Sequence, residues 1–279
     1  MNRDTGRLDL RVIRETDECI QKIYQDIKKE KIDNAKNNII KLLSTSNFFI
    51  REYVGKKFVD CPYEDQMNTI ISELIDHKIY GVRAGIIFYH YIKYDNNPEK
   101  IFTLLDKSWN DTPWETEFIL HEMWQKHPDI MKTKMLAWAE SDFVKQKTIA
   151  YHGIENIANS DPIYVLKLIE KNLNEPNLDL QKKISNILSH VVKARPAEAY
   201  SFFREWLTNP SECRNKTIFL AMKKLVSIAS LPKTSKTDDF YILTMQTVQD
   251  WKVDPVKSVS IMGEKLASFA KNPIFNEQE

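Results

Sequence analysis

The amino-acid sequence predicts an all-α fold built from stacked helical hairpins. Only 6 glycines and 11 prolines occur in 279 residues, so helix interiors are rarely interrupted and β-turn residues are scarce. Apolar residues recur with helical rather than alternating spacing along most of the chain. One short motif, followed each time by an amphipathic segment, also returns at several places.

The recurring motif is a lead residue, an apolar residue and usually a basic residue, directly before an amphipathic helix. Its copies are Phe49-Ile50-Arg51, Gly81-Val82-Arg83, Phe143-Val144-Lys145, Asp179-Leu180-Gln181 and Glu212-Cys213-Arg214. Successive apolar residues are 32, 62, 36 and 33 residues apart, and the long interval predicts a degenerate copy between Trp114 and Trp124. A repeat of this length is one helix–turn–helix unit that must stack on its neighbours to bury its apolar face.

Second helices are expected between these copies. They cover residues 63–75, 98–106, 161–172 and 196–207. Pro162 and Pro196 stand at helix starts, where the missing amide donor has no intrahelical partner in any case. Residues 1–231 are therefore predicted to form a HEAT-like α-solenoid of about six to seven helical hairpins.

The chain after residue 231 is predicted to close the solenoid. Residues 231–239 read as a polar linker, and residues 240–251 and 256–270 as capping helices. Residues 272–279 are expected to be a frayed tail. The second segment, residues 232–279, is thus a linker with capping helices and a tail.

Cysteine usage and hydropathy predict a soluble, cytoplasmic monomer. Cys19, Cys61 and Cys213 are far apart and lack CxxC spacing, so we expect neither disulfides nor a zinc site. No stretch approaches the ~18 apolar residues of a membrane span. Nucleotide-binding and hydrolase fingerprints are absent, and the scattered helical histidines do not have metal-site spacing, so no cofactor or metal is expected.

Charge is distributed unevenly, although the formal net charge is only +1. Residues 60–129 hold 6 Lys/Arg against 13 Asp/Glu, whereas residues 131–236 hold 17 against 10. A basic series near the ends of successive first helices consists of Lys145, Lys147, Lys182, Lys183, Lys193, Arg195, Arg214 and Lys216. In a solenoid these side chains can line up along a phosphate backbone; ordinary solvated helix surface is the alternative.

A tryptophan-rich acidic segment spans residues 104–124 and is the most unusual stretch of the chain. In one interpretation, Trp109 and Trp114 fill a bend between hairpins. In the other, an aromatic side chain and a carboxylate together face a ligand and contact sugar or base edges. The sequence leaves both interpretations open.

Three stretches together resemble the AlkD-type DNA alkylation repair proteins, over about residues 48–227. They are KSWNDTPWETEFILHEM, WAESDFVKQKTIAYHGIEN and LDLQKKISNILSHVVKARPAEAYSFF. The resemblance implies a HEAT-like solenoid that holds duplex DNA in a concave basic groove and a DNA glycosylase that excises N3- and N7-alkylated purines.

The resemblance also implies roles for individual residues. Trp109 matches a packing aromatic, and Asp111 or Glu115 is the candidate catalytic carboxylate. Trp114 stands where the family has its catalytic aspartate, and Lys147 where it has an arginine. A later tryptophan position of the family is occupied by Asn186.

The leading hypothesis is therefore a protein that binds duplex DNA, with base excision as a further activity. Trp109, Trp114 and Lys147 are its expected substrate-binding residues. The expected contacts to the nucleic-acid backbone are Lys145, Lys182, Lys183, Arg214 and Lys216. The alternative is a non-catalytic scaffold that binds another protein on its concave face. Neither hypothesis requires a membrane or a metal.

Overall fold

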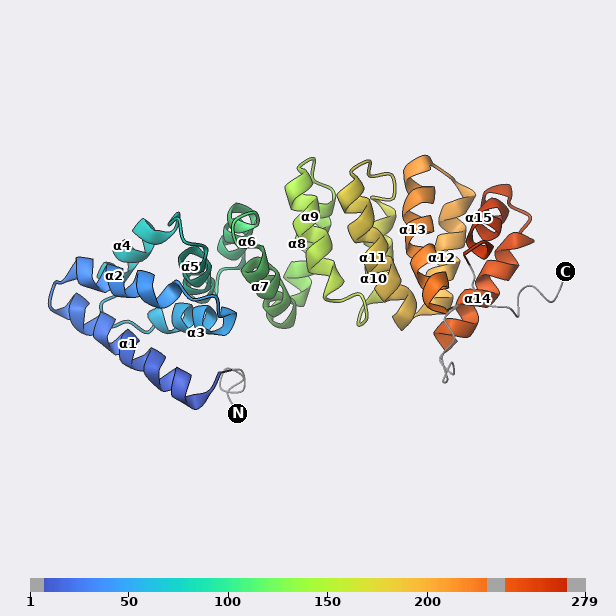
Figure 1. Ribbon diagram of the computed structural model, residues 1–279. Coiled ribbons are helices and arrows are strands. Elements are labelled where there is room, and N and C mark those ends of the chain that lie inside the picture. Colours follow the sequence, from blue (N-terminus) through green and yellow to red (C-terminus); the bar gives the residue numbers. More distant parts are fainter. Residues whose placement is uncertain (1–7, 230–238, 270–279) are drawn as a thin grey trace. The chain divides into compact units, whose positions relative to one another are not determined.

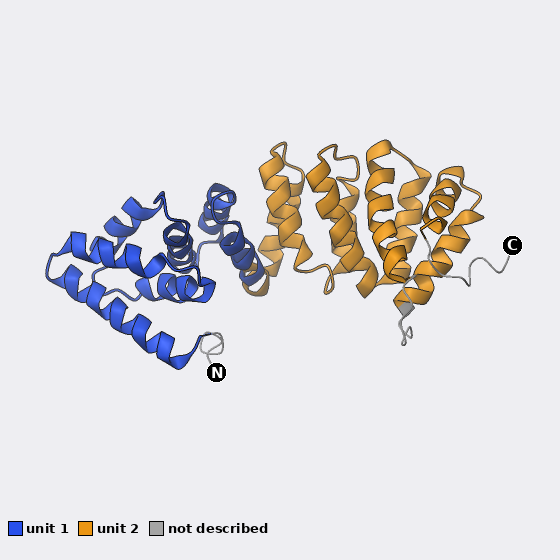
Figure 2. Cartoon of the chain, viewed as in Figure 1, with its two compact units in different colours: residues 1–122 blue, residues 123–279 orange. Residues whose placement is uncertain are grey.

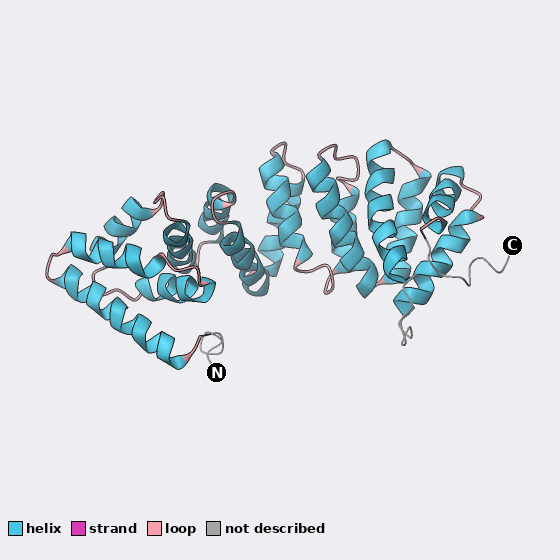
Figure 3. Cartoon of the chain, viewed as in Figure 1, coloured by secondary structure: helices cyan, strands magenta, loops and turns pink. Residues whose placement is uncertain are grey.

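The computed structural model describes residues 8–229 and 239–269, in which every regular element is a helix (Figures 1 and 3). Fifteen helices and no strand occur within these two ranges, which confirms the predicted all-α helical-repeat class. None of them is long and apolar enough to cross a membrane. The predicted linker, residues 231–239, lies outside the described residues except for Asp239, which begins α14, and the predicted tail lies outside them as well. The helices are α1 (Leu10–Lys28), α2 (Ile32–Leu43), α3 (Phe48–Phe58), α4 (Glu64–Leu74), α5 (Tyr80–Lys93), α6 (Pro98–Ser108), α7 (Pro113–Lys126), α8 (Pro128–Ala139), α9 (Val144–Glu155), α10 (Pro162–Glu170), α11 (Leu178–Ala194), α12 (Pro196–Thr208), α13 (Glu212–Ala229), α14 (Asp239–Lys252) and α15 (Lys257–Ala267).

The helices follow the order that the repeat predicts. Each motif copy lies at the start of a first helix, namely α3, α5, α9, α11 and α13, and α7 occupies the place of the degenerate copy. Proline stands at the first position of α6, α8, α10 and α12, so second helices begin where the missing amide proton costs nothing. Both capping helices are present as α14 and α15.

The chain divides into two compact units, residues 1–122 (unit 1) and 123–279 (unit 2), and the division falls within α7 (Figure 2). Unit 1 contains 18 Lys/Arg and 21 Asp/Glu, a net charge of −3. Unit 2 contains 22 Lys/Arg and 18 Asp/Glu, a net charge of +4. The charge asymmetry of the sequence therefore separates the two units.

Unit 1 packs its helices around a core of aliphatic side chains. The core cluster includes Ile23, Ile39 and Met67, each fully buried. Helices α3 and α5 approach so closely at Gly55 that a Cβ there would lie 2.3 Å from the carbonyl oxygen of Gly85. Glycine is required at this crossing because any larger residue would have to displace backbone.

In unit 2 the first helices α9, α11 and α13 are neighbours in chain order, with α11 packed against both others. In Figure 1 the loops that lead into these three helices lie along the same edge of the unit. The inward stripe of α11 is fully buried and consists of Ile184, Ile187, Leu188, Val191 and Val192. Equivalent positions on the three helices are therefore brought side by side, as in a helical-repeat stack.

The basic residue of the motif holds the loop that precedes its helix. Arg51 donates to the carbonyl oxygen of Thr45 (3.0 Å) and Arg83 to that of His77 (2.7 Å). Arg214 similarly donates to the carbonyl oxygens of Asn209 and Trp206. These loop carbonyls lie outside the helical hydrogen-bond pattern, so a long donor side chain satisfies them.

Gln181, which departs from the basic rule, makes the same kind of contact. Its Nε2 donates to the carbonyl oxygen of Glu175 at 2.8 Å. In four of the five copies the motif therefore places a side-chain hydrogen-bond donor here, and in one of them the donor carries no positive charge.

Candidate functional site

The residues predicted for the chemical site are divided between the two units. Trp109, Asp111, Trp114 and Glu115 belong to unit 1, whereas Lys147 belongs to unit 2. All the predicted backbone-binding residues also belong to unit 2.

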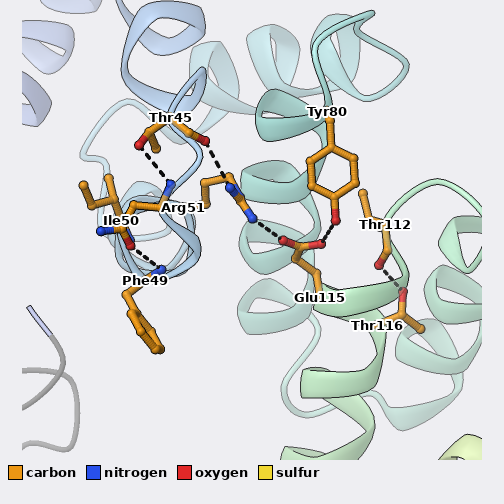
Figure 4. Close-up of polar contacts among 9 residues, drawn as sticks. Thr45, Phe49, Ile50, Arg51, Tyr80, Thr112, Glu115 and Thr116 are labelled. Carbon is orange, nitrogen blue, oxygen red and sulfur yellow. Dashed lines mark hydrogen bonds and ion pairs between the residues drawn. The ribbon is translucent and has the colours of Figure 1, made fainter.

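Glu115 is enclosed between three first helices of unit 1 (Figure 4). Its carboxylate accepts a hydrogen bond from Arg51 Nη2 of α3 at 2.8 Å and one from the Tyr80 hydroxyl of α5 at 2.6 Å. Glu115 is fully buried and the side chain of Arg51 is 7 % exposed. Because both carboxylate oxygens are bound, this residue joins α3, α5 and α7 in the structure.

The surroundings of this ion pair are aromatic. The Arg51 guanidinium lies 5.5 Å from the ring centre of Tyr80 and 5.9 Å from that of Phe48. Burial raises the pKa of Tyr80, and its hydrogen bond to the Glu115 carboxylate raises it further. The hydroxyl is thus held as a neutral donor toward Glu115.

The other predicted residues of unit 1 differ in accessibility. Trp109 is buried at the end of α6, which fits packing between hairpins. Trp114, the second residue of α7, is 70 % exposed. Asp111 is exposed and lines a narrow pocket together with Arg83 and Lys107. Asp111 is therefore accessible to a ligand, whereas Glu115 is not.

Lys147, predicted as a phosphate contact, is engaged inside unit 2. Its Nζ lies 2.6 Å from Oε2 of Glu175, which is 6 % exposed. The other oxygen of Glu175 accepts the amide of Asn177, and its backbone carbonyl accepts Gln181. Burial raises the pKa of the nearby Tyr151, and the Glu175 carboxylate adds to this effect. Lys147 thus stabilises the loop before α11.

The exposed side of α11 carries charged and polar groups one to two turns apart. Lys182, Asn186 and His190 are exposed at i, i+4 and i+8. Lys183 lies beside them and is half-buried. Helix α13 begins 34 residues after α11, one residue more than the motif spacing of 33. Counted from the helix starts, Lys216 and Lys224 of α13 stand at the positions of Lys182 and His190, and both are exposed.

Side-chain contacts join this surface across the three first helices of unit 2. Lys183 of α11 lies 2.5 Å from Oε2 of Glu155 and 3.0 Å from Nδ1 of His152, both on α9. His190 lies 3.6 Å from the same carboxylate. Lys224 of α13 donates to Asn186 of α11 at 3.3 Å.

We call this surface the basic face. It consists of Lys182, Lys183, His190, Lys216, Lys224 and His152. Lys182 is 68 % exposed, and its ion pair within the described residues is with Asp179, three residues earlier on the same helix and 91 % exposed, at 3.2 Å. Such a pair contributes little to stability, so Lys182 is available to an anionic ligand.

The remaining predicted backbone contacts have different environments. Arg214 is committed to the loop carbonyls described above. Lys145 is half-buried near the start of α9. Lys216 is exposed and forms no ion pair within the described part of the chain.

Sequence reasoning missed several members of this surface. His152, His190 and Lys224 had no assigned role, although the 34-residue interval from His190 to Lys224 matches that from Lys182 to Lys216. Glu155, which links α9 to α11, was also missed. A search at this interval finds Lys216 from Lys182 and Lys224 from His190, whereas on α9 it leads to Thr148 and Asn156 and does not find His152. Within the described residues, no group of three or more His, Cys, Asp or Glu is placed to hold a metal ion.

Comparison with protein-family models and with curated proteins finds no match to this chain. Among solved structures, the chain is similar to the crystal structure of an engineered protein with 10 % identity and a TM-score of 0.32, over 86 % of this chain and 79 % of that one. Another engineered protein gives 11 % identity and a TM-score of 0.28, over 85 % and 96 % of the two chains. Likenesses this weak add nothing about fold or function.

Proposed function

We propose that the protein binds duplex DNA through the basic face of unit 2. The observation that carries this proposal is the recurrence of exposed lysines at matching positions of neighbouring first helices, Lys182 on α11 and Lys216 on α13. Phosphates repeat regularly along a duplex, so regularly spaced cations on a repeat surface suit a phosphate backbone.

Three further features support the proposal. Unit 2 has the positive net charge, +4. The carboxylates that contact the basic face, Glu155 and Asp179, are fewer than its four lysines. The chain also resembles AlkD-type proteins over the stretches that form α9 and α11.

Binding is tested by fluorescence anisotropy of labelled duplex DNA with the full chain over a range of salt concentrations. A surface that contacts about three to four phosphates loses affinity with a log–log slope of roughly −3. The double variant Lys182→Gln/Lys216→Gln is expected to weaken binding and to reduce the magnitude of this slope by about 2.

The matched control is Lys167→Gln, which removes an equally exposed lysine from the second helix α10. It is expected to bind with the wild-type slope. Equal losses in the control and the double variant, or no duplex binding even at low salt, would refute the proposal.

The resemblance extends the proposal to excision of alkylated purines. Since Glu115 is enclosed with both oxygens bound, the exposed Asp111 is the carboxylate that we assign to this chemistry. Release of methylated purines from alkylated duplex DNA is the assay. Release by the wild-type protein that is lost in Asp111→Asn supports excision. If the wild-type protein releases no methylated purine, excision is rejected, and DNA binding is still decided by the anisotropy experiment.

A second candidate is a scaffold for a protein partner, favoured by exposed apolar residues where first helices of unit 2 begin. Phe143 and Val144 at the start of α9 are 69 % and 48 % exposed, and Leu178 at the start of α11 is 53 % exposed. Exposed apolar side chains grouped in this way are typical of protein interfaces. If a protein partner binds there, Phe143→Ser should weaken its affinity, and the affinity should change little with salt concentration.

A further inference from the structure

Unit 1 contains a pocket between α1 and α2 that belongs to none of the sites above. Its volume is about 280 Å³, near the lower limit for small-molecule sites. Thr16, Cys19 and Lys22 line it from one face of α1, at intervals of three residues. Lys41 and Leu42 line it from α2, and Ile50 contributes from α3.

The charged residues that line this pocket are all positively charged. Lys22 and Lys41 reach it from different helices, and none of its described lining residues is acidic. Both lysines are exposed and form no ion pair within the described residues. Two ammonium groups at one mouth raise the local positive potential, which attracts a small anion.

The remaining lining is suited to an apolar body with one polar end. Leu42 and Ile50 are half-buried and present aliphatic surface to the pocket. Thr16 lines the pocket and is 5 % exposed. The Asn38 amide, also in the lining, is already bound to Asp26 at 2.9 Å. Lys22 and Lys41 are therefore the charged groups available to a ligand.

We propose that this pocket binds a small amphipathic anion, a carboxylate on a short aliphatic body. Lys22 and Lys41 bind the carboxylate, and the aliphatic body covers Leu42 and Ile50. The charge-assisted contacts set the orientation, and burial of the apolar body supplies the hydrophobic contribution to affinity. This proposal is independent of nucleic-acid binding by unit 2.

Cys19 provides a reporter for the pocket because it lines the pocket and is exposed, whereas Cys61 is buried. The experiment measures alkylation of each cysteine by iodoacetamide in the full chain, by peptide mass spectrometry, with and without octanoate. At ten times its dissociation constant, octanoate is expected to slow alkylation of Cys19 about tenfold. Cys213 in unit 2 is the internal reference, and its rate should not change.

The role of charge is tested with octanol and with two lysine variants. Octanol, which has the same aliphatic body and no charge, is expected to protect Cys19 much less than octanoate does at the same concentration. Lys22→Met/Lys41→Met should lose the protection by octanoate, while Lys28→Met, an exposed lysine of α1 outside the pocket, should retain it. Each variant is compared with itself in the absence of ligand, which cancels any direct effect on thiol reactivity.

Three results would contradict the proposal. Absence of protection by octanoate at millimolar concentration refutes the site. Equal protection by octanol and octanoate refutes the anionic ligand class. Unchanged protection in the double lysine variant, whose helix content is checked by circular dichroism, refutes the assignment of Lys22 and Lys41.

Discussion

A first helix of each unit carries a charged residue, and these two residues lie in opposite environments. In unit 1, Arg51 and Glu115 turn inward and are 7 % and 0 % exposed. In unit 2, Lys182 stands at the start of its first helix with 68 % of its side chain exposed. A buried ion pair makes each partner depend on the other, whereas an exposed one leaves the lysine free to exchange partners. The Arg51–Glu115 pair therefore holds helices of unit 1 together, whereas Lys182 of unit 2 is available for binding.

The largest expected effect comes from breaking the buried pair. Glu115→Ala leaves the Arg51 guanidinium buried without its carboxylate, so the free energy of unfolding should fall by about 3–5 kcal/mol. Urea denaturation measures this loss. Asp111→Ala, four residues earlier and exposed, is the control and should change stability by less than about 0.5 kcal/mol. Similar small effects for both variants would show that the pair does not stabilise unit 1.

A smaller effect is expected from the loop contact of unit 2. Gln181→Met keeps the length of the side chain but removes the donor to the Glu175 carbonyl oxygen, in a position that is 2 % exposed. Leaving that carbonyl unsatisfied should cost about 1–3 kcal/mol in urea denaturation. A cost near zero would contradict the inference that the motif conserves a donor.

Acid should destabilise unit 1 through His90. Burial, followed by the charges of Lys93 and Lys107, lowers the pKa of His90 to about 4 from 6.5. Between pH 4 and 6.5, His90 is therefore protonated more in the unfolded chain than in the folded one. Its contribution to the free energy of unfolding is complete above pH 6.5 and is lost as the pH falls toward 4. His90→Gln should make the thermal unfolding temperature less dependent on pH across this window. If the unfolding temperature of His90→Gln depends on pH as that of the wild type does, groups other than His90 cause the loss of stability in acid.

The smallest effect on stability is expected at the basic face. Lys182→Met should change the free energy of unfolding by less than about 0.5 kcal/mol, because its pair with Asp179 is fully solvated. Its affinity for duplex DNA should nevertheless fall. A loss of stability comparable to that of Glu115→Ala would remove this contrast between the two units.

Much of the architecture could be predicted from local sequence. The prolines at the starts of α10 and α12 and the helical apolar spacing place these helices within a few residues of their observed bounds. The 62-residue interval correctly indicated a hidden helix, α7. Such signals are local because helix capping and amphipathicity act within a few turns.

The candidate site was less predictable because its contacts are distant in sequence. Arg51 and Glu115 are 64 residues apart, and no spacing rule of the repeat indicates that they pair. The basic residue of the motif was interpreted as charge, whereas Arg214 and Gln181 show that its place requires a donor. The sequence gives the side chain at each position, but it does not show whether a neighbouring loop already forms hydrogen bonds with that side chain.

Hydrogen–deuterium exchange of the full chain with and without duplex DNA, at low salt, tests the central claim most directly. The basic face predicts added protection in α11 and α13 around Lys182 and Lys216, and no change in α3 or α5. Protection confined to α3 and α5, or no protection anywhere at saturating DNA, would contradict the assignment of binding to unit 2.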